Sequence, residues 1–113
     1  MTAGERRPRS SRLAGQAERT RVLEGGQRRR SRFLECIWMD NSSGHPRMGL
    51  IVPKFQSRGV ARNRLRRRLT EIWRRELQAQ QGGRDLLIRA RKEAYGASFA
   101  DLRGDLLGWV EGL

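Results

Sequence analysis

Residues 59 to about 81 carry an apolar pattern that commits the chain to a helix packed on another layer. At about 100° per residue, the apolar side chains of this stretch fall on one arc: Ala61, Leu65, Leu69, Ile72, Trp73 and Leu77. Six arginines stand among the eleven residues 58–68, and the charged side chains that fall outside the arc are Arg64, Arg67, Arg68, Arg74 and Arg75. One face of this helix must therefore pack, while the other meets solvent or a ligand.

Two of these arginines share the direction of the apolar arc. Arg62 and Arg66 lie on the azimuth of Leu65 and Leu69, but in the first turns of the helix. A helix that extends past its sheet would direct such side chains at a ligand beside the sheet. We therefore expect both arginines at the edge of the packed layer and not inside it.

Periodicity and turn residues divide the rest of the chain into short elements. We expect helices over residues 12–24, 59–81 and 98–113, and strands over residues 32–40, 47–53 and 85–92. Ser98 with Asp101 predicts a capping box at the start of the last helix. The order α-β-β-α-β-α indicates an α+β fold, a small sheet with helices packed on it. We expect the 113 residues to divide into a disordered basic arm, 1–11, and a single RNA-binding domain, 12–113.

Alternation along the strand 32–40 gives its two sides different surroundings. One side is wholly apolar, and we place it on the core: Leu34, Cys36 and Trp38. The other side carries a carboxylate among apolar residues, and we place it toward a cleft: Phe33, Glu35, Ile37 and Met39. The first helix offers a thin apolar face of Leu13, Ala17 and either Val22 or Leu23.

The positive charge is concentrated in two segments. Residues 1–32 hold ten arginines and three glutamates, and residues 58–75 hold eight arginines and one glutamate, so each segment has a charge of +7 within a total of +13. Lys54 and Lys92 are the only lysines, and guanidinium groups bind phosphate bidentately and stack on bases. The pattern favours nucleic acid over an anionic membrane as partner. A solvated helix face is the plainer alternative.

Few residue types suit catalysis or metal binding. His45 is the only histidine and Cys36 the only cysteine, so neither a pair of groups titrating near neutrality nor a thiolate cage for zinc is available. The carboxylates are not spaced as metal ligands. We predict no catalytic and no metal-binding residue in this chain. Without a signal-peptide core or an apolar run long enough to cross a bilayer, a soluble cytoplasmic protein is expected.

Several segments, in chain order, resemble the family of the protein subunit of bacterial ribonuclease P. The most specific is Val60-Ala61-Arg62-Asn63-Arg64-Leu65-Arg66-Arg67-Arg68-Leu69, which contains the family's Arg-Asn-Arg signature. Residues 47–54, 83–91 and 98–102 are similar to the family's flanking strands and last helix, and residues 12–26 fit its first helix. The chain departs at Arg19, where the family has an aromatic residue, and at Pro53-Lys54-Phe55, where it has Ser-Lys-Lys.

The resemblance implies a ribosomal-protein-S5-domain-2-like sandwich that assists endonucleolytic removal of the 5′ leader of precursor tRNA. In that family the RNA subunit supplies the active site and the Mg²⁺ ions, and the protein is an accessory subunit without a catalytic residue. The expected partners are the ribonuclease P RNA and precursor tRNA, with one protein per RNA, no membrane and no cofactor bound by the protein alone. The residues that we expect to dock on the RNA subunit are Arg58, Arg62, Asn63, Arg64, Arg66, Arg67 and Arg68.

The resemblance also implies a cleft between the first helix and the sheet that takes the single-stranded leader. For it we expect Phe33, Ile37 and Met39 to pack on bases, with Arg19 and Lys54 on phosphates. Ordinary packing of a helix on a sheet explains these residues equally well. A non-catalytic structural RNA-binding protein, such as a small ribosomal protein, is the alternative function, because it would use the same kind of basic α+β module.

Overall fold

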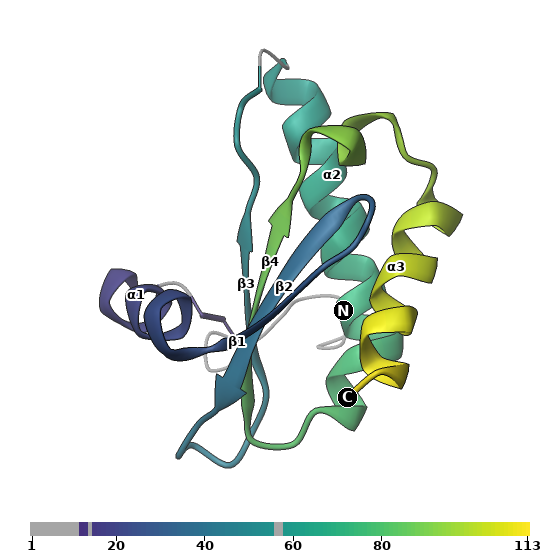
Figure 1. Ribbon diagram of the computed structural model, residues 1–113. Helices are drawn as coiled ribbons and strands as arrows, with labels where there is room; N and C mark the ends of the chain where they lie inside the picture. Colours follow the sequence, from purple (N-terminus) through teal and green to yellow (C-terminus); the bar gives the residue numbers. More distant parts are fainter. Residues whose placement is uncertain (1–11, 14, 56–57) are drawn as a thin grey trace, which may run out of the picture.

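A four-stranded sheet forms the middle layer of the protein (Figure 1). The computed structural model describes residues 12–13, 15–55 and 58–113, so the arm expected over residues 1–11 lies outside the described residues. The strands are β1 (Gln27–Arg30), β2 (Leu34–Asp40), β3 (Arg47–Ile51) and β4 (Arg84–Ala90), in the spatial order β1-β2-β4-β3. The predicted α+β class is confirmed.

The pairing of the strands makes the basic helix the connection between β3 and β4. β2 pairs antiparallel with β1 and with β4, whereas β3 and β4 pair in parallel. Parallel neighbours need a crossover connection, and α2 (Gly59–Ile72) makes it. Its helical path continues through a π-helical turn, Trp73–Leu77, and a 3₁₀ turn, Gln78–Gln80, so the predicted extent of this helix is confirmed.

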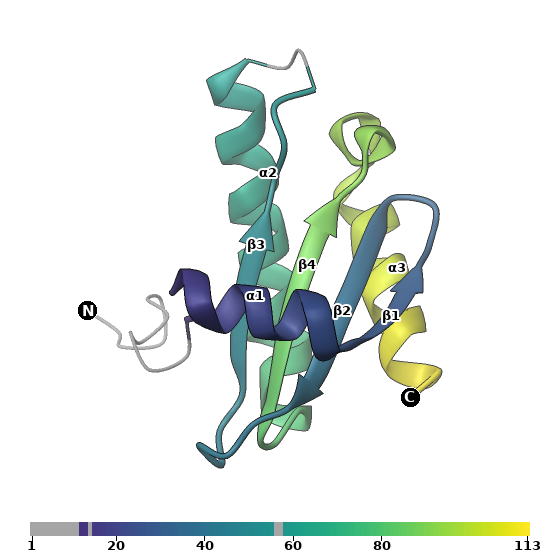
Figure 2. The same cartoon turned by 60° about the vertical axis from the view of Figure 1, so that its left-hand side comes forward.

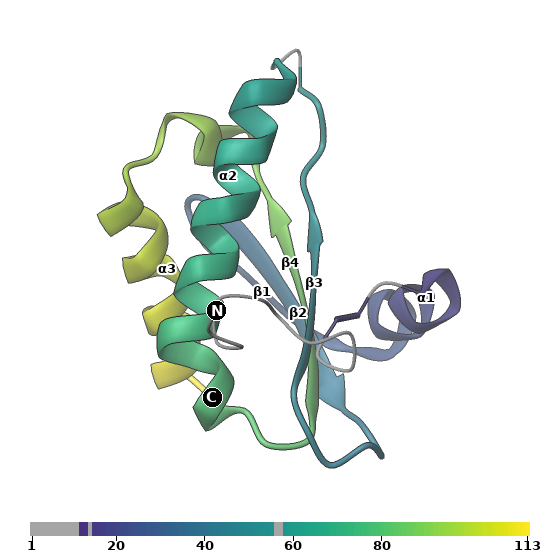
Figure 3. The same cartoon turned by 180° about the vertical axis from the view of Figure 1, so that it is seen from behind.

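The larger core lies between the sheet and a pair of helices, α2 and α3 (Phe99–Glu111), which cover one face of the sheet (Figure 3). Leu34, Cys36 and Trp38 of β2 face this core, as their alternation predicts. The apolar arc of the basic helix is buried there as well, from Leu65 to Leu77. The capping box of Ser98 and Asp101 is present at the start of α3.

The opposite face of the sheet is crossed by α1 (Gln16–Gly25), as Figure 2 shows. The core beneath α1 is small and consists of Leu13, Val22, Ile37 and Leu87. The prediction that this helix begins at residue 12 is wrong, because Leu13 lies in an extended segment whose N–H donates to the carbonyl of Met48, 3.1 Å away. Ala17, expected on the apolar face, is exposed.

A buried carboxylate fastens α1 to the sheet. Asp85 of β4 is 0% exposed and accepts hydrogen bonds from Arg21 of α1 (2.6 Å) and from Arg47 of β3 (2.8 Å). Arg47 also pairs with Glu18 of α1. Burial acts to raise the pKa of Asp85, but the hydrogen bonds from Arg47 and Asn41 and the nearby positive charges outweigh it and hold that pKa below its usual value.

The strand β1 is absent from the sequence prediction. Its four residues are polar and exposed, so no apolar alternation marks them. Backbone pairing with Glu35–Trp38 of β2 makes this segment a strand. The added strand extends the sheet beyond β2, and it contributes arginines to the site described below.

Candidate RNA-binding surfaces

The first turns of α2 present a row of arginines, which we call the arginine ridge: Arg58, Arg62, Arg64, Arg66, Arg67 and Arg68. Arg62 and Arg68 are half-buried and the other four are exposed, as is Asn63 among them. Leu65 and Leu69 of the same helix are 3% and 0% exposed. The predicted division of this helix into a packed and a charged face is confirmed.

The arginine ridge is not neutralised by the protein's own carboxylates. Within residues 12–13, 15–55 and 58–113, no carboxylate lies within 4.0 Å of these six guanidinium groups. Arg62 donates to the carbonyl of Val52 (3.2 Å) and Arg68 to that of Ala97 (3.2 Å). The next arginines along the helix, Arg74 and Arg75, both pair with Glu71. The ridge is therefore a concentrated positive surface.

Arg66 lies at the edge of the sheet, where its position in the first turns predicts it. It lines a small hollow of about 80 Å³ beside β3 together with Arg12 and Arg19. Arg19 is fixed there because its Nε donates to the carbonyl of Leu13, 3.0 Å away. Arg19, expected in the leader cleft, is thus brought next to a residue expected to dock the catalytic RNA.

Of the other residues expected in the cleft, Ile37 and Met39 lie together in the core beneath α1, apart from Lys54 and Phe33. Ile37 is 0% exposed beneath α1, so a nucleobase cannot reach it. Met39 is partly buried beside the same core and contacts Arg21. Lys54 is exposed beyond the end of β3. Ile37 and Met39 therefore take part in ordinary helix packing, which the sequence leaves as an equal alternative.

The grouping of Phe33 with Ile37 is wrong. Phe33 is 9% exposed and belongs to the core on the α2 and α3 side. Its backbone precedes β2, where the N–H donates to Asp105 of α3 (2.9 Å) and the carbonyl accepts from the N–H of Arg91 (2.9 Å). Alternation of sides holds only within a strand, so it does not extend to this residue.

A second basic surface lies on the part of the sheet that α1 leaves uncovered, and we call it the sheet hollow. It has a volume of about 290 Å³ and is lined by Arg30, Glu35, Phe55, Arg89, Ala90, Arg91, Lys92 and Glu93. None of its arginines is predicted from the sequence. The signals that mark them are the alternation of β4, which puts Arg89 on the same face as Leu87, and the basic run Gln27–Arg30.

The floor of the sheet hollow is a carboxylate surrounded by guanidinium groups. The side chain of Glu35 is 8% exposed and accepts a hydrogen bond from Arg89 (3.1 Å), with Arg28 and Arg30 3.8 and 3.9 Å away. Three guanidinium groups therefore share one carboxylate. The lining as a whole carries four cationic side chains (Arg30, Arg89, Arg91 and Lys92) and two carboxylates (Glu35 and Glu93), so the hollow keeps an excess of positive charge.

The groups most capable of acid–base or nucleophilic chemistry lie outside both surfaces. Cys36 is buried in the larger core, where burial, aided by the charge of Asp105, raises the pKa of its thiol to about 12. His45 lies in the loop between β2 and β3. In the described part of the chain, no three His, Cys, Asp or Glu side chains are placed to hold a metal ion, and no helix is long and apolar enough to cross a membrane.

Comparison with known proteins gives consistent results. The family model described as Ribonuclease P matches residues 8–113. The ribonuclease P protein component of Methylococcus capsulatus is 38% identical over 96 residues, which cover 84% of this chain and 74% of that protein. The one from Thermus scotoductus is 40% identical over 85 residues, 75% of this chain and 49% of that protein, so the chain spans about half of that relative.

The fold is similar to a solved structure of a Staphylococcus aureus ribonuclease P protein mutant. The TM-score is 0.81, with 88% of this chain and 84% of that chain covered. At 21% identity this likeness supports the fold alone.

Proposed function

The chain belongs to the ribonuclease P protein family, whose members are the protein component of the endoribonuclease for tRNA 5′ maturation, and from this premise we propose which surface meets which RNA. The arginine ridge docks on the ribonuclease P RNA, and the sheet hollow holds the single-stranded leader of precursor tRNA. The observation that carries the proposal is the absence of carboxylate partners for the ridge in the described residues. Docking therefore requires no ion pair to be broken first.

The ridge suits a folded RNA better than a particular sequence. Arginine contacts to phosphate supply affinity and depend on salt, whereas base edges supply specificity. Asn63, exposed between Arg62 and Arg64, both donates and accepts hydrogen bonds and so suits a base edge or a 2′-hydroxyl. With one such ridge on the described surface, one protein per RNA is the simplest assembly.

The chemistry of cleavage is assigned to the RNA subunit with its Mg²⁺ ions. Both proposed surfaces of the protein are dominated by guanidinium groups, whose positive charge repels metal cations. Their contribution is to hold phosphates close together at low Mg²⁺. The protein should therefore lower the Mg²⁺ concentration that the RNA needs.

Reconstitution tests the docking surface. The protein, a bacterial ribonuclease P RNA and labelled precursor tRNA are combined at low Mg²⁺, and both leader removal and the salt dependence of protein–RNA affinity are measured. Arg67→Ala should lower the slope of log affinity against log salt by about one unit for each phosphate that Arg67 neutralises. The matched control is Arg75→Ala, because Arg75 is also exposed but is paired with Glu71. An unchanged slope for Arg67→Ala, or tight RNA binding without stimulated cleavage, would refute the proposal.

A second comparison tests the sheet hollow. Arg30 has a side chain that is 67% exposed, so Arg30→Ala removes a charge from the hollow without disturbing the core. The holoenzyme should lose part of its preference for precursor over mature tRNA, while the affinity of the protein for the catalytic RNA stays the same. Arg103→Ala, on α3, is the control. Equal losses for precursor and mature tRNA would place the leader elsewhere.

A further inference from the structure

An apolar hollow interrupts the arginine ridge at the start of α2. It has a volume of about 370 Å³ and is lined by Arg58, Val60, Ala61, Arg64 and Tyr95. Val60 is 75% exposed, although it is a large apolar residue at the surface of a helix. The surface that the proposed function assigns to RNA therefore includes an apolar patch between two guanidinium groups.

The aromatic wall of this hollow is held in place. Tyr95 lies in the 3₁₀ turn Lys92–Gly96, and its hydroxyl donates to the carbonyl of Pro53. Its ring meets that of Phe55 edge to face, with the centroids 6.2 Å apart and the planes at 82°. Phe55 has a φ of 44°, a left-handed conformation that costs energy for a residue other than glycine.

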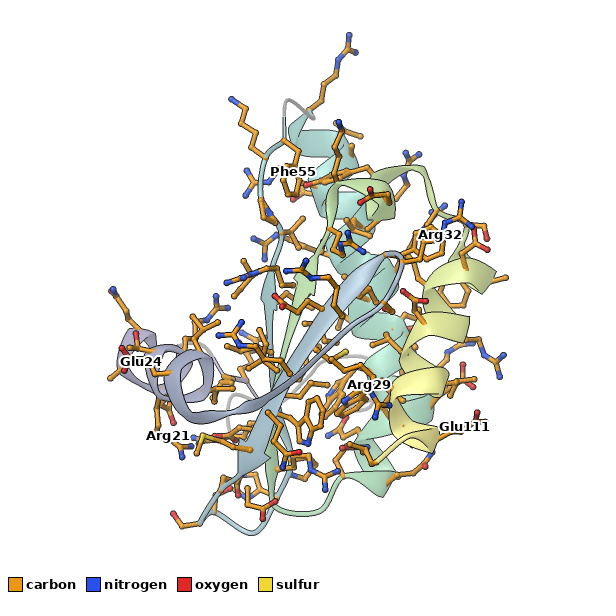
Figure 4. All side chains as sticks on the ribbon, in the orientation of Figure 1. Arg21, Glu24, Arg29, Arg32, Phe55 and Glu111 are labelled. Carbon is orange, nitrogen blue, oxygen red and sulfur yellow. The ribbon has the colours of Figure 1, made fainter. Side chains whose placement is uncertain are left out.

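This aromatic pair divides two surfaces. Phe55 is 44% exposed and lines the sheet hollow, whereas Tyr95 lines the apolar hollow on the α2 side. Figure 4 shows Phe55 beside the start of α2. A ligand in the apolar hollow would therefore be separated by two rings from a leader strand in the sheet hollow.

The charges around the hollow select the kind of occupant. Arg58 and Arg64 are exposed, and neither is paired with a carboxylate of the described chain. An apolar side chain or a lipid tail would fill the floor and leave both charges without anions. A nucleobase brings a flat apolar face together with a phosphate on each side, so it matches the floor and the flanks at once.

We propose that this hollow holds one unstacked nucleobase of the ribonuclease P RNA, with Arg58 and Arg64 on the flanking phosphates. The inference rests on the proposed docking of the arginine ridge. It adds a contact that recognises an unpaired base of the RNA, whereas the rest of the ridge contacts the phosphate backbone of the RNA. The catalytic RNA is chosen as the source because both flanking arginines belong to the ridge.

The test separates an apolar contact from a charge contact. Val60→Gln removes the apolar floor without changing the charge, and Val60 is too exposed for the fold to depend on it. Leu113→Gln is the matched control, because Leu113 is an aliphatic residue that is 49% exposed at the end of the chain. Affinity for the ribonuclease P RNA alone is measured from low to high salt, and the bases of that RNA are probed chemically.

Val60→Gln should weaken binding roughly tenfold at every salt concentration with an unchanged slope, because the contact between Val60 and the base neutralises no phosphate, so its loss leaves the number of released counterions the same. Arg64→Ala should instead lower the slope. One unpaired base of the RNA should be protected by the wild-type protein and by Leu113→Gln, but not by Val60→Gln.

Three results would overturn the inference: equal affinities for Val60→Gln and Leu113→Gln, a changed slope for Val60→Gln, or an effect that arises only when precursor tRNA with its leader is present. The last would make the occupant a leader base. Failure of the proposed function looks different, because the wild-type protein itself would then neither bind the RNA in a salt-dependent way nor stimulate cleavage.

Discussion

The buried carboxylate of Asp85 should control how firmly α1 is held on the sheet, and Asp85→Asn tests this. The carboxylate is 0% exposed and accepts hydrogen bonds from Arg21, Arg47 and Asn41 at 2.6 to 2.8 Å. The amide of asparagine presents hydrogen-bond donors to these donors and carries no charge. Arg47, whose side chain is 18% exposed, would then lose its main anion.

The expected loss of stability follows from the exposure of the partners. Removing one member of a buried ion pair costs about 3–5 kcal/mol, but the side chain of Arg21 is 44% exposed and can be rehydrated. We therefore expect the free energy of unfolding to fall by about 2–3 kcal/mol. In a domain of this size that corresponds to a drop in Tm of roughly 10 °C.

Urea unfolding followed by tryptophan fluorescence measures this loss, since Trp38, Trp73 and Trp109 are all buried. Asp40→Asn is the matched control, because Asp40 is an exposed aspartate at the end of the neighbouring strand. It should change the free energy of unfolding by less than about 0.5 kcal/mol. A similarly small change for Asp85→Asn would refute the idea that this carboxylate fastens α1.

The pH dependence gives an independent check. The folded pKa of Asp85 lies below its usual value, which is about 3.9 in an unfolded chain. The stabilisation is therefore complete well above pH 3.9 and is lost as the pH falls through that value and on through the folded pKa. The wild type and Asp85→Asn should accordingly become similar in stability in strong acid. A difference that stays constant on acidification would point to packing and not to charge.

Two further predictions concern the cores. Gly49→Ala should cost about 1–3 kcal/mol, because an added Cβ would lie 2.5 Å from the carbonyl oxygen of Leu13; Gly104→Ala, in open space on α3, should instead stabilise the protein slightly. Urea unfolding measures the free energy of unfolding of both variants, and equal changes would contradict the close approach of Gly49 in β3 to the carbonyl of Leu13. The Cys36 thiol, with its pKa raised to about 12 by burial, should resist a disulfide reagent at pH 8 and react fully in urea. Rapid reaction of the folded protein would contradict its burial.

The elements that the sequence predicts correctly are those with a complete local pattern. The helix from residue 59 onward has an apolar arc sustained over several turns, and the inward side of β2 is wholly apolar. The capping box of Ser98 and Asp101 is contained in four residues. In each case the neighbouring residues along the chain carry the whole signal, so no knowledge of the tertiary structure is needed.

The elements that it misses depend on partners far away in the chain. β1 becomes a strand only through its pairing with β2, since its own residues are polar and exposed. Phe33 turns into the larger core because Asp105 of α3 binds its backbone. The sheet hollow combines Arg30 of β1, Glu35 of β2 and Arg89 of β4, which no local spacing brings together. Its arginines could be found only after the strand order was known.

The positions of the carboxylates explain why the arginine ridge remains free. Glu71 is the one acidic residue within residues 58–75, and it pairs with Arg74 and Arg75 of the following π-helical turn, at the spacings of three and four residues that favour pairing. Asp85 and Glu35 are buried on the sheet, and Glu76 pairs with Arg103 of α3. These four acidic residues thus hold layers together or neutralise the arginines that follow α2. A carboxylate placed one turn earlier would compete with phosphate for the same guanidinium groups, so RNA affinity depends on where the acidic residues lie as much as on the number of arginines.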